Sequence, residues 1–350
     1  MKLFKLSSLR FGLVLLGASL TWSVNAAETP EQFYKGKQID LYASAISGGN
    51  GVFARPLAHY MRQYLPGQPN IVMKEMLGAG GLVLANYMGQ IAPKDGLVLA
   101  TVNRGILVDP LLKTPSAVYD ASKFSLIGSL GPELAICFVN ADSPANTIEK
   151  AQERDVILGS VGPTTITATY PHLLNATINT RFKIIAGYQT TQEIMVAMER
   201  REVEGMCVSY GTLKTNRPDW IPSKKVTALI QFAFKPHPEL KDVPTLDGVK
   251  DPTARNMLEF YTLPDEVARP YFGPPGIPAD RLNALRRAFD AAVKNPELMA
   301  EEAKLKLELD PMSGEEAERR LKALYAIPES TIQQVITALE KQRETNAIKR

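Results

Sequence analysis

The first part of the chain repeats one pattern, in which a short apolar stretch leads through a glycine-containing turn into residues spaced like one face of a helix. Apolar residues alternate with polar ones along 38–46, which predicts a strand, and those between 53 and 65 recur at helical spacing. A second strand is predicted at 71–73 with a helix over 84–91, and a third strand at 97–102. Strands that alternate with helices predict an α/β fold, with helices on both faces of a mostly parallel sheet.

The same order of elements returns in the second part of the chain. Strands are predicted at 155–158, 183–186 and 203–208, and a helix follows the second of them. Five prolines between 264 and 278 exclude a continuous helix there, and helical spacing resumes after Asp280.

Two segments connect these two sets of elements. An extended run at 124–139 is broken by glycines and a proline, and 226–234 is a candidate for the return. We therefore expect two lobes joined by a hinge, with lobe 1 formed by residues 27–128 and 233–350 and lobe 2 by residues 129–232. A chain of 350 residues exceeds the usual size of one hydrophobic core, which agrees with this division.

The N-terminus has the three parts of a secretory signal. Basic residues precede an apolar run at 11–20, and Val24-Asn25-Ala26 forms a small-residue cleavage site. No later stretch approaches the roughly 20 apolar residues that a membrane-spanning helix requires. We expect residues 1–26 to be a cleaved signal peptide and the mature protein to be periplasmic.

The charge of the chain argues against nucleic acid as a partner. Three of its 40 basic residues lie in the signal sequence, which holds no acid, so 37 basic and 37 acidic residues remain. A neutral chain lacks the excess of positive charge that binds phosphate backbones.

The two cysteines, Cys137 and Cys207, each lie in an apolar stretch that is typical of a strand. In an oxidising compartment they could form a disulfide, but the sequence favours two separate buried thiols. The pairing is left open at this stage.

The glycine turns after the predicted strands are the candidate ligand site. In an open α/β sheet, ligands bind at the carboxyl ends of the strands. Helix starts there present unpaired N–H groups to an anion, and glycine lets a ligand approach the backbone closely. The predicted ligand-binding residues are Ser47, Gly48, Gly49, Asn50, Gly51, Gly78, Ala79, Gly80, Gly81, Asn103, Arg104, Ser160, Gly162, Thr164, Thr165, Tyr188 and Gln189.

Several of these side chains also have an ordinary structural interpretation. A serine or threonine in such a turn is about as often a helix N-cap as a ligand contact. Arg104 could clamp a carboxylate or face solvent, and Tyr188 could line a pocket or only pack against its neighbours.

Enzyme motifs are incomplete in this sequence. The turn at 78–81 lies where a dinucleotide-binding fingerprint would, but Val83 occupies the third glycine position. No Walker lysine follows a glycine turn, and Ser160 lacks the glycine two residues before it that a nucleophile elbow needs. The three histidines have no neighbours at metal-ligand spacing. The sequence therefore predicts a protein that is not an enzyme and that binds no cofactor or metal.

Several motifs, in order along the chain, resemble the tripartite tricarboxylate transporter receptors, also called the Bug family. These motifs are Phe33-Tyr34-Lys35-Gly36-Lys37, Ser47-Gly48-Gly49 with Ala54-Arg55, Gly78-Ala79-Gly80-Gly81 with Ala85-Asn86-Tyr87, Ala92-Pro93-Lys94-Asp95-Gly96, Asp242-Val243-Pro244-Thr245 and Phe272-Gly273-Pro274-Pro275-Gly276-Ile277-Pro278. The resemblance implies a two-lobed type II periplasmic binding protein fold, with mixed sheets, flanking helices and a ligand cleft between the lobes. Gly51 stands where the family usually has an acidic residue, so the resemblance does not name the ligand.

The expected function is that of a monomeric receptor that captures a small organic acid and delivers it to the membrane subunits of a tripartite tricarboxylate-type transporter. One alternative is a ligand sensor for a membrane kinase. Another is an exported hydrolase on the same scaffold, using Ser160 with Glu204 or His172.

Overall fold

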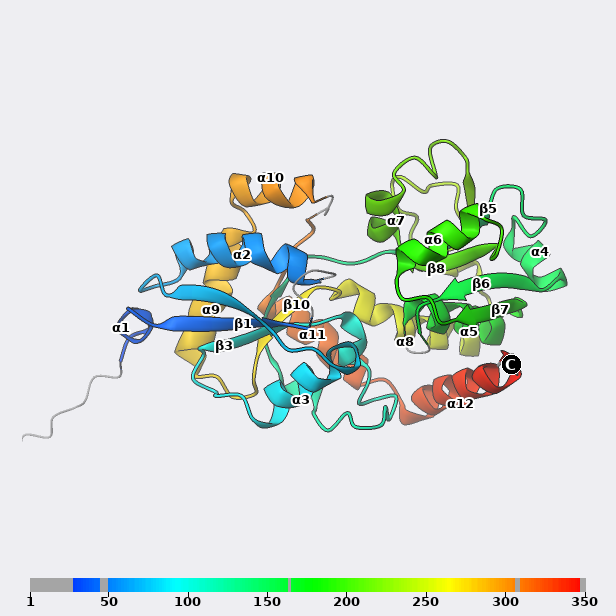
Figure 1. Cartoon of the computed structure of the whole chain (residues 1–350). Coiled ribbons are helices and arrows are strands. Elements are labelled where there is room, and N and C mark those ends of the chain that lie inside the picture. Colours follow the sequence, from blue (N-terminus) through cyan, green and yellow to red (C-terminus); the bar gives the residue numbers. More distant parts are fainter. Residues whose placement is uncertain (1–27, 45–49, 163–164, 306–308, 347–350) are drawn as a thin grey trace, which may run out of the picture.

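The computed structural model describes residues 28–44, 50–162, 165–305 and 309–346. The expected signal peptide at 1–26 lies outside the described residues. The described chain forms two β-sheets with helices on their faces, and Figure 1 shows the sheets in separate halves of the molecule.

Sheet A contains the first three predicted strands. It spans β1 Gln38–Ala43, β2 Asn70–Glu75, β3 Val98–Thr101, β4 Ser125–Ser129, β10 Pro270–Gly273 and β11 Met312–Ser313, in the order β11-β4-β10-β3-β1-β2. β1 is parallel to β2 and β3, whereas β10 is antiparallel to β3 and β4. Ile39, Leu41 and Ala43 are buried, as the alternation along β1 predicts.

Sheet B contains the strands predicted in the second part of the chain. It spans β5 Ala135–Asn140, β6 Val156–Ser160, β7 Phe182–Ala186, β8 Gly205–Ser209 and β9 Val226–Gln231, in the order β7-β6-β8-β5-β9. β6 is parallel to β7 and β8, and β5 is antiparallel to β8 and β9. The prediction of mostly parallel sheets is therefore wrong, because strands next to the crossover segments, β4, β5, β9 and β10, pair antiparallel to their neighbours.

Helices cover both faces of each sheet. Their bounds are α1 Pro30–Tyr34, α2 Asn50–Tyr64, α3 Leu82–Gln90, α4 Ile148–Glu153, α5 Ile166–Ile178, α6 Thr191–Glu199, α7 Tyr210–Asn216, α8 Pro252–Glu266, α9 Ala279–Ala292, α10 Pro296–Lys304, α11 Gly314–Tyr325 and α12 Glu329–Asn346, with 3-10 turns η1 Ala79–Gly81, η2 Arg104–Leu107, η3 Ala121–Lys123 and η4 Leu246–Gly248. On sheet A, α2 packs against α9, and α9 and α11 pack against β4. On sheet B, α6 packs against β6 and β8, and α5 packs against β7 and β8. Strands β4, β5 and β8 are buried along their whole length, and helices pack against β4 and β8.

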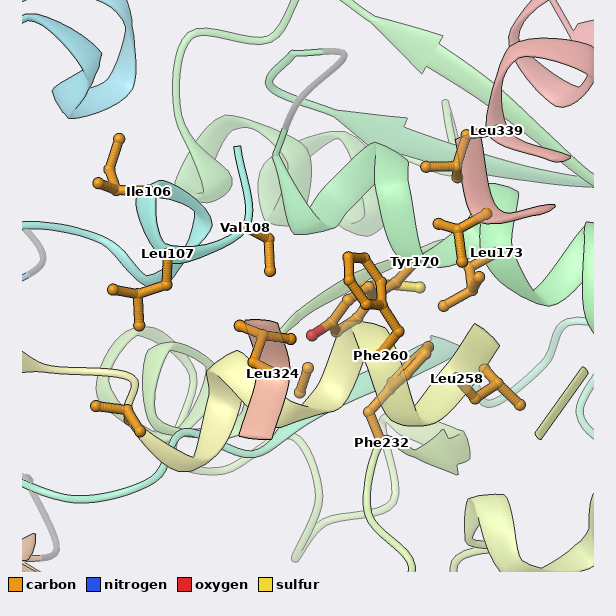
Figure 2. Close-up of a cluster of buried hydrophobic side chains, with 14 of the residues drawn as sticks. Ile106, Leu107, Val108, Tyr170, Leu173, Phe232, Leu258, Phe260, Leu324 and Leu339 are labelled. Carbon is orange, nitrogen blue, oxygen red and sulfur yellow. The ribbon is translucent and has the colours of Figure 1, made fainter. Parts of the chain in front are cut away.

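One hydrophobic cluster is shared by both halves of the molecule. α8 and α12 both pack against α5, and α8 also packs against α11 and η2. The shared cluster includes the residues labelled in Figure 2, which are Ile106, Leu107, Val108, Tyr170, Leu173, Phe232, Leu258, Phe260, Leu324 and Leu339. Residues of η2, which follows β3 of sheet A, therefore belong to the same cluster as residues of α5, which covers sheet B.

The two cysteines form a disulfide. Cys137 in β5 lies directly opposite Cys207 in the antiparallel register with β8, and their sulfurs are bonded. Both residues are buried. The favoured prediction of two separate thiols is wrong, because the sequence did not reveal that these two strands are neighbours.

We expect replacement of both cysteines by alanine to lower the free energy of unfolding by about 2–4 kcal/mol, because the bond joins residues 70 positions apart and restricts the unfolded chain. Urea denaturation of both proteins without reductant measures this loss. In strong reductant the free energies of unfolding of the variant and the wild type should differ much less. Equal stability of the variant and the disulfide-bonded wild type would contradict the prediction.

Candidate functional site

The turns that follow β1, β2 and β3 converge at one edge of sheet A. Gly81 has a φ of 104°, and a Cβ there would lie 3.3 Å from the Cβ of Ser44 and 3.6 Å from Nδ2 of Asn103. Gly78, at φ 132°, and Ala79, at φ 46°, also have positive φ. The side chain of Asn103 accepts a hydrogen bond from the N–H of Gly105 at 2.9 Å, as the N-cap of η2. The carboxyl ends of β1 and β3 thus lie close to the predicted turn that follows β2.

The first long helix of sheet A begins at this same edge. α2 starts at Asn50, after the carboxyl end of β1, and Gly51 is buried in its first turn. The first N–H groups of a helix have no partner within it and carry the positive end of the helix dipole. Ser47, Gly48 and Gly49, the rest of this predicted loop, lie outside the described residues.

A cluster of hydroxyl groups fixes the turn that follows β6. Ser160 Oγ accepts the N–H of Gly162 at 3.1 Å, and Thr167 Oγ1 accepts the N–H of Val161 at 3.1 Å. Thr165 Oγ1 donates to the carbonyl of Gly162 at 2.8 Å. Two of the backbone donors expected to face a ligand are therefore bonded within the turn. Thr164 lies outside the described residues.

The start of α5 is the counterpart of the start of α2. Thr165 is the N-cap residue of α5, but its side chain makes no capping hydrogen bond to the first turn. The helix thus begins at the carboxyl end of β6, and the side chain of its N-cap residue does not satisfy the first N–H groups. Each half of the molecule has a helix that starts at the carboxyl end of a parallel strand.

Tyr188 and Gln189 follow the end of β7. Tyr188 is half-buried and packs close to Gly159, where a Cβ would lie 3.3 Å from Tyr188 Cε2. Gln189 is exposed, and its backbone N–H donates to the Glu193 carboxylate at 2.8 Å. Tyr188 therefore has a packing role in this structure.

Arg104 is buried in a network that joins the two halves. Its guanidinium is ion-paired with Glu133, in the first crossover segment, and with Asp265, in α8. The hydroxyl of Tyr170, in α5, donates to Asp265 Oδ2 at 2.6 Å, and Arg269 pairs with Glu133 at 3.3 Å. The sequence offered a ligand clamp or a solvent-facing side chain. Instead Arg104 holds two carboxylates of the chain itself.

The buried acids in and near this network have different pKa values. Burial raises the pKa of Asp265 to about 7, although Arg104 opposes the change. Burial also acts to raise the pKa of Glu133, but Arg104 and Arg269 hold it below its usual value. Close to Arg269, burial raises the pKa of Glu302 to about 8, so this acid is protonated at neutral pH. At pH 7 Glu133 is therefore the most fully ionised of the three, whereas Asp265 is close to its pKa.

A cavity of about 650 Å³ lies beside this network. Its walls come from the two crossover segments, the start of α7, the end of α8 and Asp310. The residues that line it are Pro132, Glu133, Leu134, Tyr210, Gly211, Lys214, Phe232, Ala233, Phe234, Lys235, His237, Pro238, Thr262, Asp265, Glu266, Arg269 and Asp310. None of these residues could be predicted for the site from the sequence, because they do not lie in the glycine turns that follow the strands.

Two of the side chains named for the alternative hydrolase, Ser160 and Glu204, are engaged elsewhere. The Ser160 hydroxyl bonds Thr167 at 2.9 Å. The Glu204 carboxylate bonds Arg154 at 2.6 Å and the N–H of Ile157, near the amino end of β6, at 3.2 Å. Ser160 lies at the carboxyl end of that strand, so Glu204 does not serve as its base. In the described part of the chain, no three His, Cys, Asp or Glu side chains gather so that they could hold a metal ion. Within the same residues no helix combines the length and apolar character of a membrane span.

Comparison with protein-family models gave no match, and comparison with curated proteins gave none either. Solved structures do match. A TctC solute-binding protein from Polaromonas, solved without ligand, is 19% identical, with 86% of this chain and 99% of that chain covered and a TM-score of 0.66. For the periplasmic binding protein BugD the identity is 22%, the coverage 90% and 99%, and the TM-score 0.59. For MatC from Rhodopseudomonas palustris, with bound malate, they are 19%, 87% and 98%, and 0.58.

These similarities extend over most of every chain compared. At identities of 19–22%, they show a shared fold. They agree with the two mixed sheets and flanking helices described above. The fold implied by the sequence motifs is confirmed: this chain has the two-lobed α/β fold of the type II periplasmic binding proteins.

Proposed function

We propose that this protein is an exported receptor of the tripartite tricarboxylate transporter type, which captures a small organic acid between its two lobes without converting it. The signal-like N-terminus at 1–26 supports a periplasmic location. The similar fold of MatC, which was solved with bound malate, supports an organic acid as the ligand. Delivery to membrane transporter subunits is part of the proposal and follows from the sequence motifs.

The observation that carries this function is the pair of helix starts at the carboxyl ends of parallel strands. α2 follows β1 in sheet A, and α5 follows β6 in sheet B. Each presents N–H groups and a positive dipole end, which together favour a carboxylate. A carboxylate that accepts hydrogen bonds from both helix starts, through one oxygen each, would bridge the two lobes.

We propose the lobe boundaries at 27–128 with 233–350 and at 129–232, as the sequence indicates. Closure would then turn about the segments that connect β4 with β5 and that follow β9. Ligand bound to both helix starts favours the closed state, because the open state provides only one of them at a time. α8 and α12, which this division assigns to lobe 1, also pack against α5 of lobe 2, so these contacts lie between the proposed lobes.

The function is tested by calorimetric titration of the mature protein with mono-, di- and tricarboxylates. We expect at least one acid to bind and its neutral amide to bind at least tenfold more weakly. Binding of neutral or cationic compounds only, with no response to any acid, would overturn the proposal.

Gly81→Ala tests the converging turns. A Cβ at φ 104° is strained and lies against Ser44 and Asn103, so the turn must shift. We expect the affinity for the acid to fall at least tenfold. Gly36→Ala is the matched control, because Gly36 also has a positive φ, of 72°, but precedes β1 at the opposite edge of the sheet. It should lose stability and keep its affinity. Equal affinities in both variants would contradict the assignment of the turns.

A further inference from the structure

We propose that the ligand is a monocarboxylate with a bulky apolar body, and that this body occupies the 650 Å³ cavity between the crossover segments. The inference rests on the proposed function, since the carboxylate group is placed at the helix starts. It adds a second part to the site, formed by residues that the glycine turns do not include.

The cavity adjoins the start of α2. Arg269 lines the cavity, and its guanidinium lies 5.5 Å from the centre of the Phe53 ring, in the first turn of α2. Arg104, which follows the Asn103 turn, is ion-paired with Glu133 and Asp265, and both acids line the cavity. The proposal places the head of the ligand at the helix start and its body in this space, with Arg269 between them.

The cavity offers apolar surface for such a body. Leu134, Phe232 and Phe234 line it, together with Tyr210 and Pro238. The ring of Phe232 stacks on Tyr170 at 4.1 Å between centroids, which holds this wall in place. Each methylene group moved from water onto such surface contributes about 0.8 kcal/mol, or about fourfold in affinity.

Five of the charged groups that line the cavity are ion-paired: Glu133, Asp265, Lys214, Glu266 and Arg269. Besides the Arg104 network, Lys214 pairs with Glu239 at 3.1 Å, and Glu266 pairs with Arg320 at 2.8 Å. Lys235 also lines the cavity, but it is exposed to solvent, where an ion pair contributes little. A second carboxylate on the ligand would lose its hydration and face four acids, Glu133, Asp265, Glu266 and Asp310, while Arg269 and Lys214 are already paired. The cavity therefore selects for an apolar body and against a dicarboxylate.

Matched pairs of acids test this selection on the unmodified mature protein. We expect octanoate to bind at least tenfold more tightly than octanedioate, which has the same chain with a second carboxylate. The affinity for octanoate should also exceed that for hexanoate about fifteenfold, because octanoate has two more methylene groups. Calorimetric titration measures all three. Tighter binding of octanedioate than of octanoate would overturn the inference.

A variant that fills the cavity provides an independent test. A Cβ at Gly211 meets no atom within 4 Å, and Gly211 lines the cavity, so Gly211→Leu extends into the empty space. We expect it to weaken octanoate binding at least tenfold. Gly248→Leu is the matched control, since Gly248 has equally open surroundings, is exposed, and lies outside the lining. Unchanged octanoate affinity in a folded Gly211→Leu protein would overturn the inference.

The two proposals fail in different ways. If malate or adipate binds tightly and octanoate does not, the receptor function stands and the apolar ligand class is wrong. If no acid binds, the receptor function itself fails. Gly81→Ala should weaken every acid that binds, whereas Gly211→Leu should weaken the bulky ones selectively.

Discussion

Replacement of Arg104 by methionine is expected to lower the free energy of unfolding by about 3–5 kcal/mol, the cost typical of removing one partner of a buried ion pair. The Arg104 side chain is 9% exposed, and its two carboxylate partners, Glu133 and Asp265, have side-chain exposures of 24% and 7%. Methionine fills much of the space but leaves both acids without this cation. Urea denaturation at pH 7.5 measures the loss.

Arg181→Met is the control for the loss of an arginine. Arg181 pairs with Asp155 at 2.7 Å, but both side chains are about half exposed, at 52% and 49%. Solvent screens such a pair, so its removal should change stability by about 0–1 kcal/mol. A second substitution, Asp265→Asn, should recover part of the stability lost in Arg104→Met, because it removes one unpaired acid. A loss below about 1 kcal/mol in Arg104→Met would contradict the assignment of this network.

The strands of this protein could be predicted because their side-chain patterns are local. β1 alternates between buried and more exposed residues, and the apolar stretches at 155–158 and 183–186 correspond to β6 and β7. Period-two alternation or a short continuous apolar stretch is set by neighbours in the sequence. The start of α2 just after the glycine turn was likewise visible, since helical spacing begins there.

The pairing between distant strands could not be predicted in the same way. The disulfide of Cys137 with Cys207 depends on β5 lying beside β8, which places the two residues in register across 70 positions. The antiparallel entry of β10 between β3 and β4 also depends on the return of the chain from the second lobe. Neither arrangement leaves a periodic signal in the sequence.

Only part of the candidate site could be predicted, again because the signals in the sequence are local. Glycine turns are local signals, and Gly81 and Asn103 do lie close together in the structure. The partners of Arg104 come from residues 133 and 265, so its burial depends on three distant segments meeting. The cavity is formed by crossover segments whose residues, such as Phe232, read as ordinary apolar sequence.

Phe260→Ala is expected to lower the free energy of unfolding by about 3–5 kcal/mol, the usual cost of truncating a buried phenylalanine. Phe260, in α8, is 0% exposed and belongs to the shared cluster, where Figure 2 shows it beside Tyr170 of α5 and between residues of α12 and η2. The cluster joins residues of η2, which follows β3 of sheet A, to residues of α5, which covers sheet B. Urea denaturation followed by far-ultraviolet circular dichroism measures the loss.

Phe289→Ala is the control that separates the effect of the shared cluster from the general cost of creating a cavity in a hydrophobic core. Phe289, in α9, is equally buried, but its cluster lies on the other face of sheet A and contains no residue of sheet B. Its truncation should cost a similar amount and leave one cooperative transition. Phe260→Ala should also broaden or split the transition, because it weakens the contacts through which the lobes unfold together. A transition that splits in Phe289→Ala and stays single in Phe260→Ala would show that another contact couples the lobes.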